Sequence, residues 1–193
     1  MNTTHRCVAA GLAALALLIS PAQGKEKDPT LRVPLEYSPQ EALGSRVPDF
    51  GGKKAPRAVK IVTEDGRTGA VPAVVGDGTD DDDRPFDISA EGDVMGFAGE
   101  VVRRNFEEWS FPVDDASKTV LTLRLSRFWV AERNQAVGSM YSAEVRWIWT
   151  LTGESGETLG WGTASGDTKR YGKERSRENC TEVLSDALKE AKG

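Results

Sequence analysis

A chain of 193 residues with a formal net charge of −5 can bury one sizeable core, and its charge has the wrong sign for general nucleic-acid binding. Its only histidine, His5, and one of its two cysteines, Cys7, lie at the extreme N-terminus. The rest of the chain therefore lacks a histidine for Ser-His-Asp or Cys-His catalysis, a Cys/His set for zinc, and a second thiol to pair with Cys180.

The N-terminal residues predict a secretory signal peptide over 1–24. The segment MNTTHR precedes an apolar run, VAAGLAALALLI at 8–19, and the small residues of SPAQG follow it. About twelve apolar residues are too few to cross a bilayer, which needs about 20. No cysteine follows the small residues, as an acylated lipoprotein would require. We therefore expect a soluble product that is periplasmic or secreted.

Residues 25–57 are predicted to form an extended arm or linker ahead of a single domain at 58–193. Five prolines and a Gly-Gly pair are spread through this segment. Within it, LRVPLEY at 31–37 is compatible with one short edge strand, because proline is tolerated at the edges of sheets.

The first half of the domain predicts one strand and one helix. AVKIV at 58–62 has the composition of a strand and precedes the turn EDGRTG. Ser89 is the expected N-cap of a helix that Pro112 stops. Its apolar residues recur at helical spacing: Val94, Phe97, Ala98, Val101, Val102, Phe106 and Trp109.

The second half predicts three strands and a last helix. TVLTLRLS at 119–126 alternates, and the apolar phase then shifts to Phe128 and Val130, which indicates a β-bulge near 126–127. YSAEVRWIWTL at 141–151 and TLGWGTASG at 158–166 read as a hairpin, and an apolar stripe predicts a helix from Arg177. The order β-α-β-β-β-α favours an α+β fold, an antiparallel sheet of about four strands with two helices packed on one face.

The aspartate run GDGTDDDDRPFD at 76–87 is interpreted as a solvated connector. An EF-hand loop that starts at Asp80 would place Arg84 at position 5, and one that starts at Asp77 would place Ile88 at position 12. Neither fits, so no metal ligands are assigned. A calcium-dependent binding or adhesion module that uses Asp77 and the aspartates at 80–83 remains the alternative.

A basic cluster, KRYGKERSR at 169–177, reverses the sign of the overall charge just before the last helix, where free backbone amides also favour anions. The candidate anion- or partner-binding residues are Lys169, Arg170, Lys173, Arg175 and Arg177. An anionic lipid or an acidic protein face would suit them. A solvated loop balanced by Glu174 and Glu178 is the alternative.

Aromatic residues, glycines and the remaining thiol have structural interpretations. Trp129 is the candidate for exposure, because the other tryptophans lie on faces predicted to be buried: Trp109, Trp147, Trp149 and Trp161. Gly160 and Gly162 either admit a ligand or partner backbone or mark a weak edge. Cys180 is expected to be a buried, unreactive thiol.

Several segments together resemble a known family: VKIVTEDGR, NFEEWSFPVDDA, TVLTLRLSRFWV, the hairpin YSAEVRWIWTLTGESGETLGWGTASG and TEVLSDALKEA. They span residues 58–191 and are similar to the YajG-like bacterial envelope lipoproteins. The resemblance implies an α/β domain with helices on one sheet face, an envelope location, and binding or assembly without catalytic residues. The missing acylated cysteine departs from the family pattern.

No GxSxG, P-loop, GxGxxG or HExxH motif occurs in the chain. We predict a non-enzymatic envelope protein without a cofactor, which binds a protein or an anionic lipid and has no membrane span. A hydrolase built on paired carboxylates is a further alternative, and it would require a cleft with two acids of unequal pKa.

Overall fold

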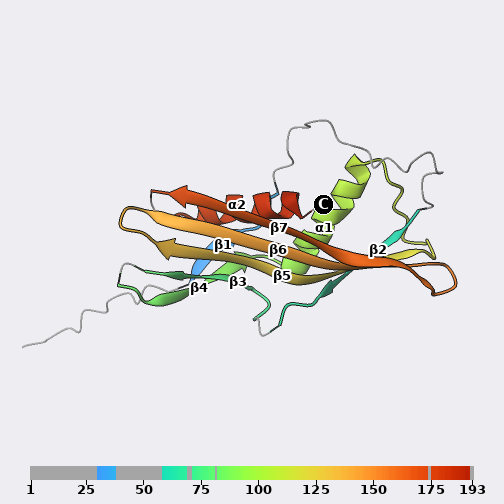
Figure 1. The fold of residues 1–193 in the computed structure, drawn as a ribbon, viewed down its shortest axis with the longest axis horizontal. Helices are drawn as coiled ribbons and strands as arrows, with labels where there is room; N and C mark the ends of the chain where they lie inside the picture. The colour runs from blue at the N-terminus through green and yellow to red at the C-terminus, as the bar shows by residue number, and fades with distance from the viewer. Residues whose placement is uncertain (1–29, 38–57, 69–70, 81, 174, 192–193) are drawn as a thin grey trace, which may run out of the picture.

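The computed structural model describes residues 30–37, 58–68, 71–80, 82–173 and 175–191. The predicted signal peptide and most of the predicted arm lie outside these residues. Figure 1 shows a long, twisted sheet with helices against it. The elements of the described residues are β1 (Leu31–Pro34), β2 (Lys60–Asp65), β3 (Val74–Thr79), β4 (Pro85–Glu91), α1 (Val94–Glu108), β5 (Val120–Asn134), β6 (Ser139–Thr152), β7 (Thr158–Gly172) and α2 (Arg177–Glu190).

The described strands form one seven-stranded sheet in the order β1-β4-β3-β5-β6-β7, and β2 pairs with β5 off this path. The pairs β1–β4, β2–β5 and β3–β5 are parallel, and the other three are antiparallel. The α+β class with two helices therefore holds for the described residues, but the expectation of about four antiparallel strands is wrong. The expected edge strand at 31–37 is confirmed as β1, in which Val33 is fully buried.

The two strands missing from the expected order, β3 and β4, contain the two ends of the aspartate run. Gly78 in β3 leaves room for the ring of Phe86, which occupies the space that a Cβ would need. Phe86 and Ile88 are buried on either side of exposed Asp87, so β4 has the alternation of a strand with one covered face. The glycines and aspartates hide this pattern in the sequence.

Because β4 continues to Glu91, the first helix begins later than expected. Ser89 lies in β4, and the N-cap of α1 is Asp93, whose side chain accepts a hydrogen bond from the Met95 amide at 3.0 Å. Gly92 connects strand and helix with φ of 119°, a conformation that glycine adopts without strain. The first helix therefore begins at Val94, where the apolar spacing also begins, and the expectation of Ser89 as its N-cap is wrong.

One edge of β5 is shared by two parallel strands. β2 pairs with Val120–Leu125 of β5, and β3 pairs with it at Val130 and Ala131. Between the two contacts the β5–β6 register shifts at 125–127, which confirms the predicted bulge. The bulge keeps both Leu125 and Phe128 in the core, although an even strand would place them on opposite faces.

The predicted hairpin at 141–166 is confirmed as β6 and β7, but the faces of β7 are reversed. Gly162 turns inward, and the indole of Trp149 lies across it, 2.8 Å from where a Cβ would be. Trp161 points outward instead, with 75% of its surface exposed. The expectation of a buried Trp161 is therefore wrong. Gly160 and Gly162 leave room for the indole of Trp149 to pack across β7, as aromatic residues pack over glycines of a neighbouring strand.

Both helices pack on the same face of the sheet (Figure 1). α2 runs over β6 and β7, whereas α1 lies beside β2. Ser176 caps α2 by accepting a hydrogen bond from the Asn179 amide at 3.3 Å. No helix among the described residues is long and apolar enough to cross a membrane. The core lies between these helices and the inward face of β3–β6.

Candidate functional site

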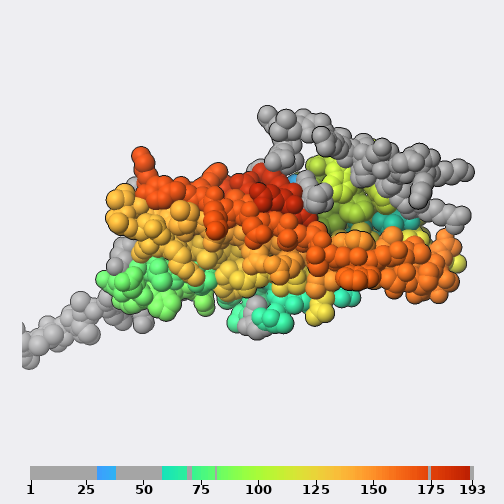
Figure 2. Space-filling view, viewed as in Figure 1, coloured from blue at the N-terminus to red at the C-terminus, as the bar shows by residue number. Residues whose placement is uncertain are grey.

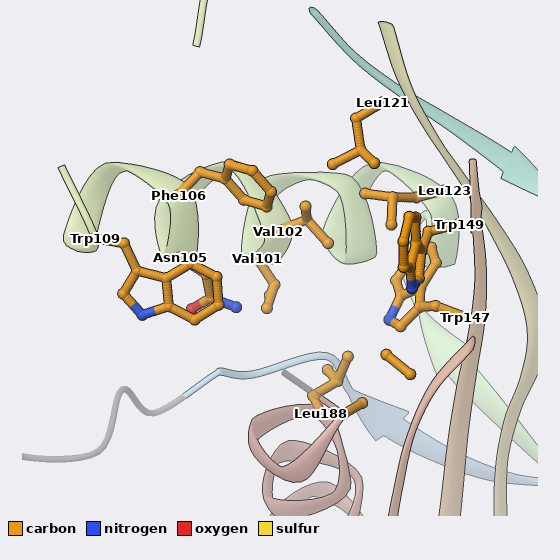
Figure 3. Close-up of a pocket in the computed structure, with 12 residues that line it drawn as sticks. Val101, Val102, Asn105, Phe106, Trp109, Leu121, Leu123, Trp147, Trp149 and Leu188 are labelled. Atoms are coloured by element: carbon orange, nitrogen blue, oxygen red, sulfur yellow. The ribbon is translucent and has the colours of Figure 1, made fainter. Parts of the chain in front are cut away.

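An apolar cavity of ≈ 270 Å³ lies between α1, α2 and the sheet (Figure 3). It combines residues from five elements that are far apart in the sequence. The lining residues are Val101, Val102, Asn105, Phe106, Trp109, Leu121, Leu123, Trp147, Trp149, Ala164, Leu188 and Ala191. Several of them are only half-buried, so the cavity reaches the surface.

The helical wall of the cavity is formed by residues of α1 that recur at helical spacing. Val101, Asn105 and Trp109 lie one turn apart and share one face. Phe106 packs against Trp109, with ring centroids 5.8 Å apart, and against Phe111 at 5.2 Å in an edge-to-face arrangement. These contacts hold the aromatic end of the wall in place beyond the last turn of the helix.

Asn105 is the polar member of the lining, and it is 6% exposed. The hydroxyl of Tyr37, just after β1, donates a hydrogen bond to its Oδ1 at 2.9 Å. A buried amide oxygen without such a donor would be unfavourable by about 1–3 kcal/mol. The contact therefore stabilises Asn105 in an apolar surrounding and fixes the segment after β1 against α1.

The sheet forms the floor of the cavity. Leu123 of β5 lies directly opposite Trp149 of β6, and Trp147 lies one inward position further along β6. Figure 3 shows both indoles turned toward the same space as Leu188 of α2. Periodicity predicted that Trp147 and Trp149 face inward, but not that the helices leave a space above them.

The basic residues predicted as a site do not converge on one point. Arg177 pairs with Glu91 at 2.8 Å, and Arg170 pairs with Glu182. Lys169 and Lys173 are exposed. Three of the five predicted residues, counting Arg175, therefore have carboxylate partners within the chain.

Arg175 is bound into the fold. Its guanidinium donates to the carbonyl of Thr79 at 2.8 Å, pairs with Glu132 at 3.3 Å and lies 4.9 Å from the ring centroid of Phe86. Glu132 also accepts a hydrogen bond from the hydroxyl of Ser139 at 2.9 Å, while its Oε2 is buried without a partner. This arrangement joins β3, β5, β6 and the segment before α2.

Cys180 lies close to this cluster and is fully buried, as expected for an unreactive thiol. Burial raises the pKa of the Cys180 thiol to about 12, and the negative charge of Glu132 adds to the shift. A thiol that ionises only at such a pH is a poor nucleophile near neutrality.

The middle of the aspartate run forms the tight connection between β3 and β4, whereas its two ends lie within these strands, so the interpretation of the whole run as a solvated connector is wrong. Asp80 accepts hydrogen bonds from the backbone amides of Asp82 and Arg84, both at 2.9 Å, and pairs with the Arg84 side chain at 2.8 Å. These contacts lower the pKa of the Asp80 carboxyl. Among the described residues, which omit Asp81, no three His, Cys, Asp or Glu side chains gather where a metal ion would sit.

Trp129 lies on the outer face of the sheet and is half-buried rather than fully exposed. Its Nε1 donates to Asp77 at 2.8 Å, and the guanidinium of Arg127 lies 4.8 Å from its ring centroid. Asp77 also pairs with Arg133 at 2.6 Å. The first aspartate of the run is therefore engaged in sheet contacts.

No protein-family model and no curated protein matches the sequence. Among solved structures, the chain is similar to protein XCC0632 from Xanthomonas campestris, of the DUF330 family, with a TM-score of 0.48 and 12% identity over 84% of this chain and 86% of that one. An uncharacterized protein matches with a TM-score of 0.45 and 9% identity over 72% and 92%. Lipoprotein GNA1162 from Neisseria meningitidis matches with a TM-score of 0.32 and 12% identity over 69% and 96%.

The three similarities name DUF330 and a lipoprotein, and none names the YajG-like family. Because all three TM-scores lie below 0.5, no function is carried over to this chain. Membership of a YajG-like family stays a prediction from the sequence.

Proposed function

We propose that this protein is a non-enzymatic protein of the cell envelope that holds the acyl chain of a lipid in the cavity between α1, α2 and the sheet. The proposal rests on the apolar lining of that cavity, where Asn105 is the single polar side chain among the described residues apart from the tryptophans. The oxygen of Asn105 already accepts a hydrogen bond from Tyr37. A polar ligand would find few partners there, whereas an alkyl chain needs none.

The dimensions of the cavity suit such a chain. An apolar cavity of about 150 Å³ binds benzene, and this one measures ≈ 270 Å³. Each methylene removed from water contributes about 0.8 kcal/mol, so a saturated chain gains affinity with each carbon that fits. The predicted signal peptide supports the same occupant, because it would deliver the protein to a compartment bounded by lipid.

The cavity tryptophans provide a direct measurement. Trp109, Trp147 and Trp149 line the cavity, whereas Trp129 and Trp161 lie on the outer face. Stearic acid that carries a nitroxide on its chain quenches indole fluorescence on close contact. We expect it to quench a Trp129→Phe/Trp161→Phe variant, and we expect unlabelled lauric acid to reverse the quenching.

Matched substitutions locate the binding. Ala164→Leu adds side-chain volume to the cavity wall and should weaken the quenching about tenfold, whereas Ala131→Leu adds the same atoms on the opposite face and should leave it unchanged. Equal quenching in both variants would place the fatty acid elsewhere. An absence of quenching in the parent protein would refute the proposal.

A further inference from the structure

Two indole N–H groups on the floor of the cavity have no acceptor. Trp147 and Trp149 lie two residues apart on the inward face of β6, so their rings are neighbours in the lining. Figure 3 shows both indole nitrogens on the side of the rings that is turned toward Leu188 of α2. Among the described residues, the indole of Trp129 donates to Asp77, whereas those of Trp147 and Trp149 donate to no residue.

Burial makes these two donors unusual. Trp147 is only 4% exposed, and buried tryptophans usually place their N–H group against an acceptor. A buried donor without an acceptor is unfavourable, because it has lost its hydrogen bond to water. The ring of Trp149 is held in place by β7, since its Nε1 lies 2.9 Å from where a Cβ of Gly162 would be. The two donors are therefore fixed in an apolar space with an unmet need for an oxygen.

The side chains of the lining supply neither that oxygen nor a charge. Oδ1 of Asn105 already accepts a hydrogen bond from Tyr37 at 2.9 Å. Among the described residues that line the cavity, none is Lys, Arg, His, Asp or Glu. An ionised carboxylate or phosphate would lie there without a compensating cation, which is strongly unfavourable in an apolar surrounding. A neutral carbonyl oxygen suits the donors and carries no such penalty.

We propose that the N–H groups of Trp147 and Trp149 bind the carbonyl oxygen of an acyl ester. A carbonyl oxygen has two lone pairs, so one oxygen can accept from both indoles. The acyl chain extends from there over Leu123 toward Phe106 and Trp109, which Figure 3 shows at the other end of the cavity. This inference rests on the proposed function, because it names the class of lipid that the same cavity holds: esterified acyl chains rather than free fatty acids.

A comparison of an ester with an alkane separates the two donors from the apolar lining. Methyl laurate and dodecane compete with the nitroxide-labelled stearic acid for the Trp129→Phe/Trp161→Phe protein, with and without Trp147→Phe. Phenylalanine keeps an aromatic ring but removes the N–H group, and Trp109 and Trp149 remain as fluorescent reporters. We expect Trp147→Phe to weaken the binding of methyl laurate about tenfold more than that of dodecane, because only the ester loses a hydrogen bond.

Two controls accompany this comparison. Phe106→Leu also removes part of an aromatic side chain from the cavity wall but no donor, so it should weaken both ligands by similar factors. Lauric acid at neutral pH should lose less affinity than methyl laurate on Trp147→Phe, because its carboxylate stays in water at the mouth of the cavity. Thermal denaturation checks that each variant is folded.

The outcomes distinguish the ester from the cavity itself. Equal losses for methyl laurate and dodecane on Trp147→Phe would overturn the inference and leave the proposed function in place, since both ligands still displace the quencher. An equal loss for lauric acid and methyl laurate would overturn the choice of a neutral ester. If neither methyl laurate nor dodecane displaces the quencher from the parent protein, the proposed function fails and the inference fails with it.

The infrared spectrum of the bound ester provides a test that needs no variant. Methyl laurate that is isotopically labelled at its carbonyl carbon has a C=O stretch that is resolved from the protein bands. Hydrogen bonds from two fixed donors weaken the C=O bond, so we expect one narrow band at a lower frequency than in a hydrocarbon solvent. A band at the hydrocarbon frequency would show that the carbonyl meets no donor, which would overturn the inference.

Discussion

Arg175 places its Nε 3.3 Å from Oε1 of Glu132, a carboxylate with no exposed surface. The arginine is partly exposed and also donates to the carbonyl of Thr79, so it links the start of α2 to the centre of the sheet. A residue that the sequence marks as a candidate for binding a partner is thus a neutralising contact for a buried charge.

Removal of this arginine should destabilise the fold. We expect Arg175→Met to lower the free energy of unfolding by about 2 kcal/mol, less than the 3–5 kcal/mol of a fully buried pair because the arginine is partly exposed. Adding Glu132→Gln should recover part of the loss, since it removes the uncompensated charge. Urea denaturation measures both, and Lys173→Met serves as the control. A loss of equal size in the control would contradict the assignment.

The contact between Tyr37 and Asn105 gives a second prediction. Tyr37→Phe removes the hydroxyl that donates to the buried Asn105 oxygen, and should lower the free energy of unfolding by about 1 kcal/mol. The same variant should admit polar probes to the cavity more readily, because the amide oxygen is left without a donor. Thermal denaturation measures the first effect. An unchanged melting temperature would show that the contact adds nothing to stability.

Because Trp149 packs directly over Gly162, a larger residue at position 162 should change the shape of the cavity. Gly162→Val would place side-chain atoms where the indole lies, and should displace the ring toward the cavity and destabilise the fold by about 1–3 kcal/mol. A shifted emission maximum of Trp149, measured with the other tryptophans replaced by phenylalanine, would report the displacement. Thr163→Val, one residue along on the outer face, is the comparison and should leave the emission unchanged.

The free energy of unfolding should depend on pH through the ionisation of the Cys180 thiol. Its thiol has a pKa near 9 when unfolded and about 12 when folded. Between these values the unfolded state loses its proton first, so stability is intact below about pH 9 and falls by up to about 1.4 kcal/mol per pH unit above it. Cys180→Ala should flatten this decline. Native protein should also resist iodoacetamide at neutral pH, and rapid labelling would contradict the burial.

The periodicity of apolar residues predicted the strands and helices that bury one face along their whole length. The stripe of β6, the bulge that keeps Leu125 and Phe128 inward, and the helix that buries Cys180 all follow from this pattern. β3 and β4 were not foreseen, because glycines make room for Val130 and Phe86 and interrupt the alternation. In β7, Trp161 alternates with glycines, and this alternation alone does not tell which face of the strand is buried. The packing of Trp149 over Gly162 turns the glycine face inward and therefore Trp161 outward.

The candidate cavity could not be predicted from the sequence in the same way. Its wall is formed by α1, β5, β6, β7 and α2, and each contributes residues that read as ordinary core. The space lies between α1, α2 and the two indoles of Trp147 and Trp149, and this arrangement depends on contacts between distant elements. The basic cluster was visible in the sequence, but the carboxylates that pair with Arg170, Arg175 and Arg177 come from elsewhere in the chain.

The sharing of one β5 edge by β2 and β3 separates the hydrogen bonds along this edge into two units, one on each side of the bulge. On one side of the bulge, β2 pairs with β5 and contacts α1, which borders the cavity; beyond the bulge, β3, β4 and β1 form a separate ladder of hydrogen bonds. The two units meet through the continuous ribbon of β5, β6 and β7. We therefore expect local opening of the short β2–β5 ladder to leave the pairing of β3 with β4 and β1 intact.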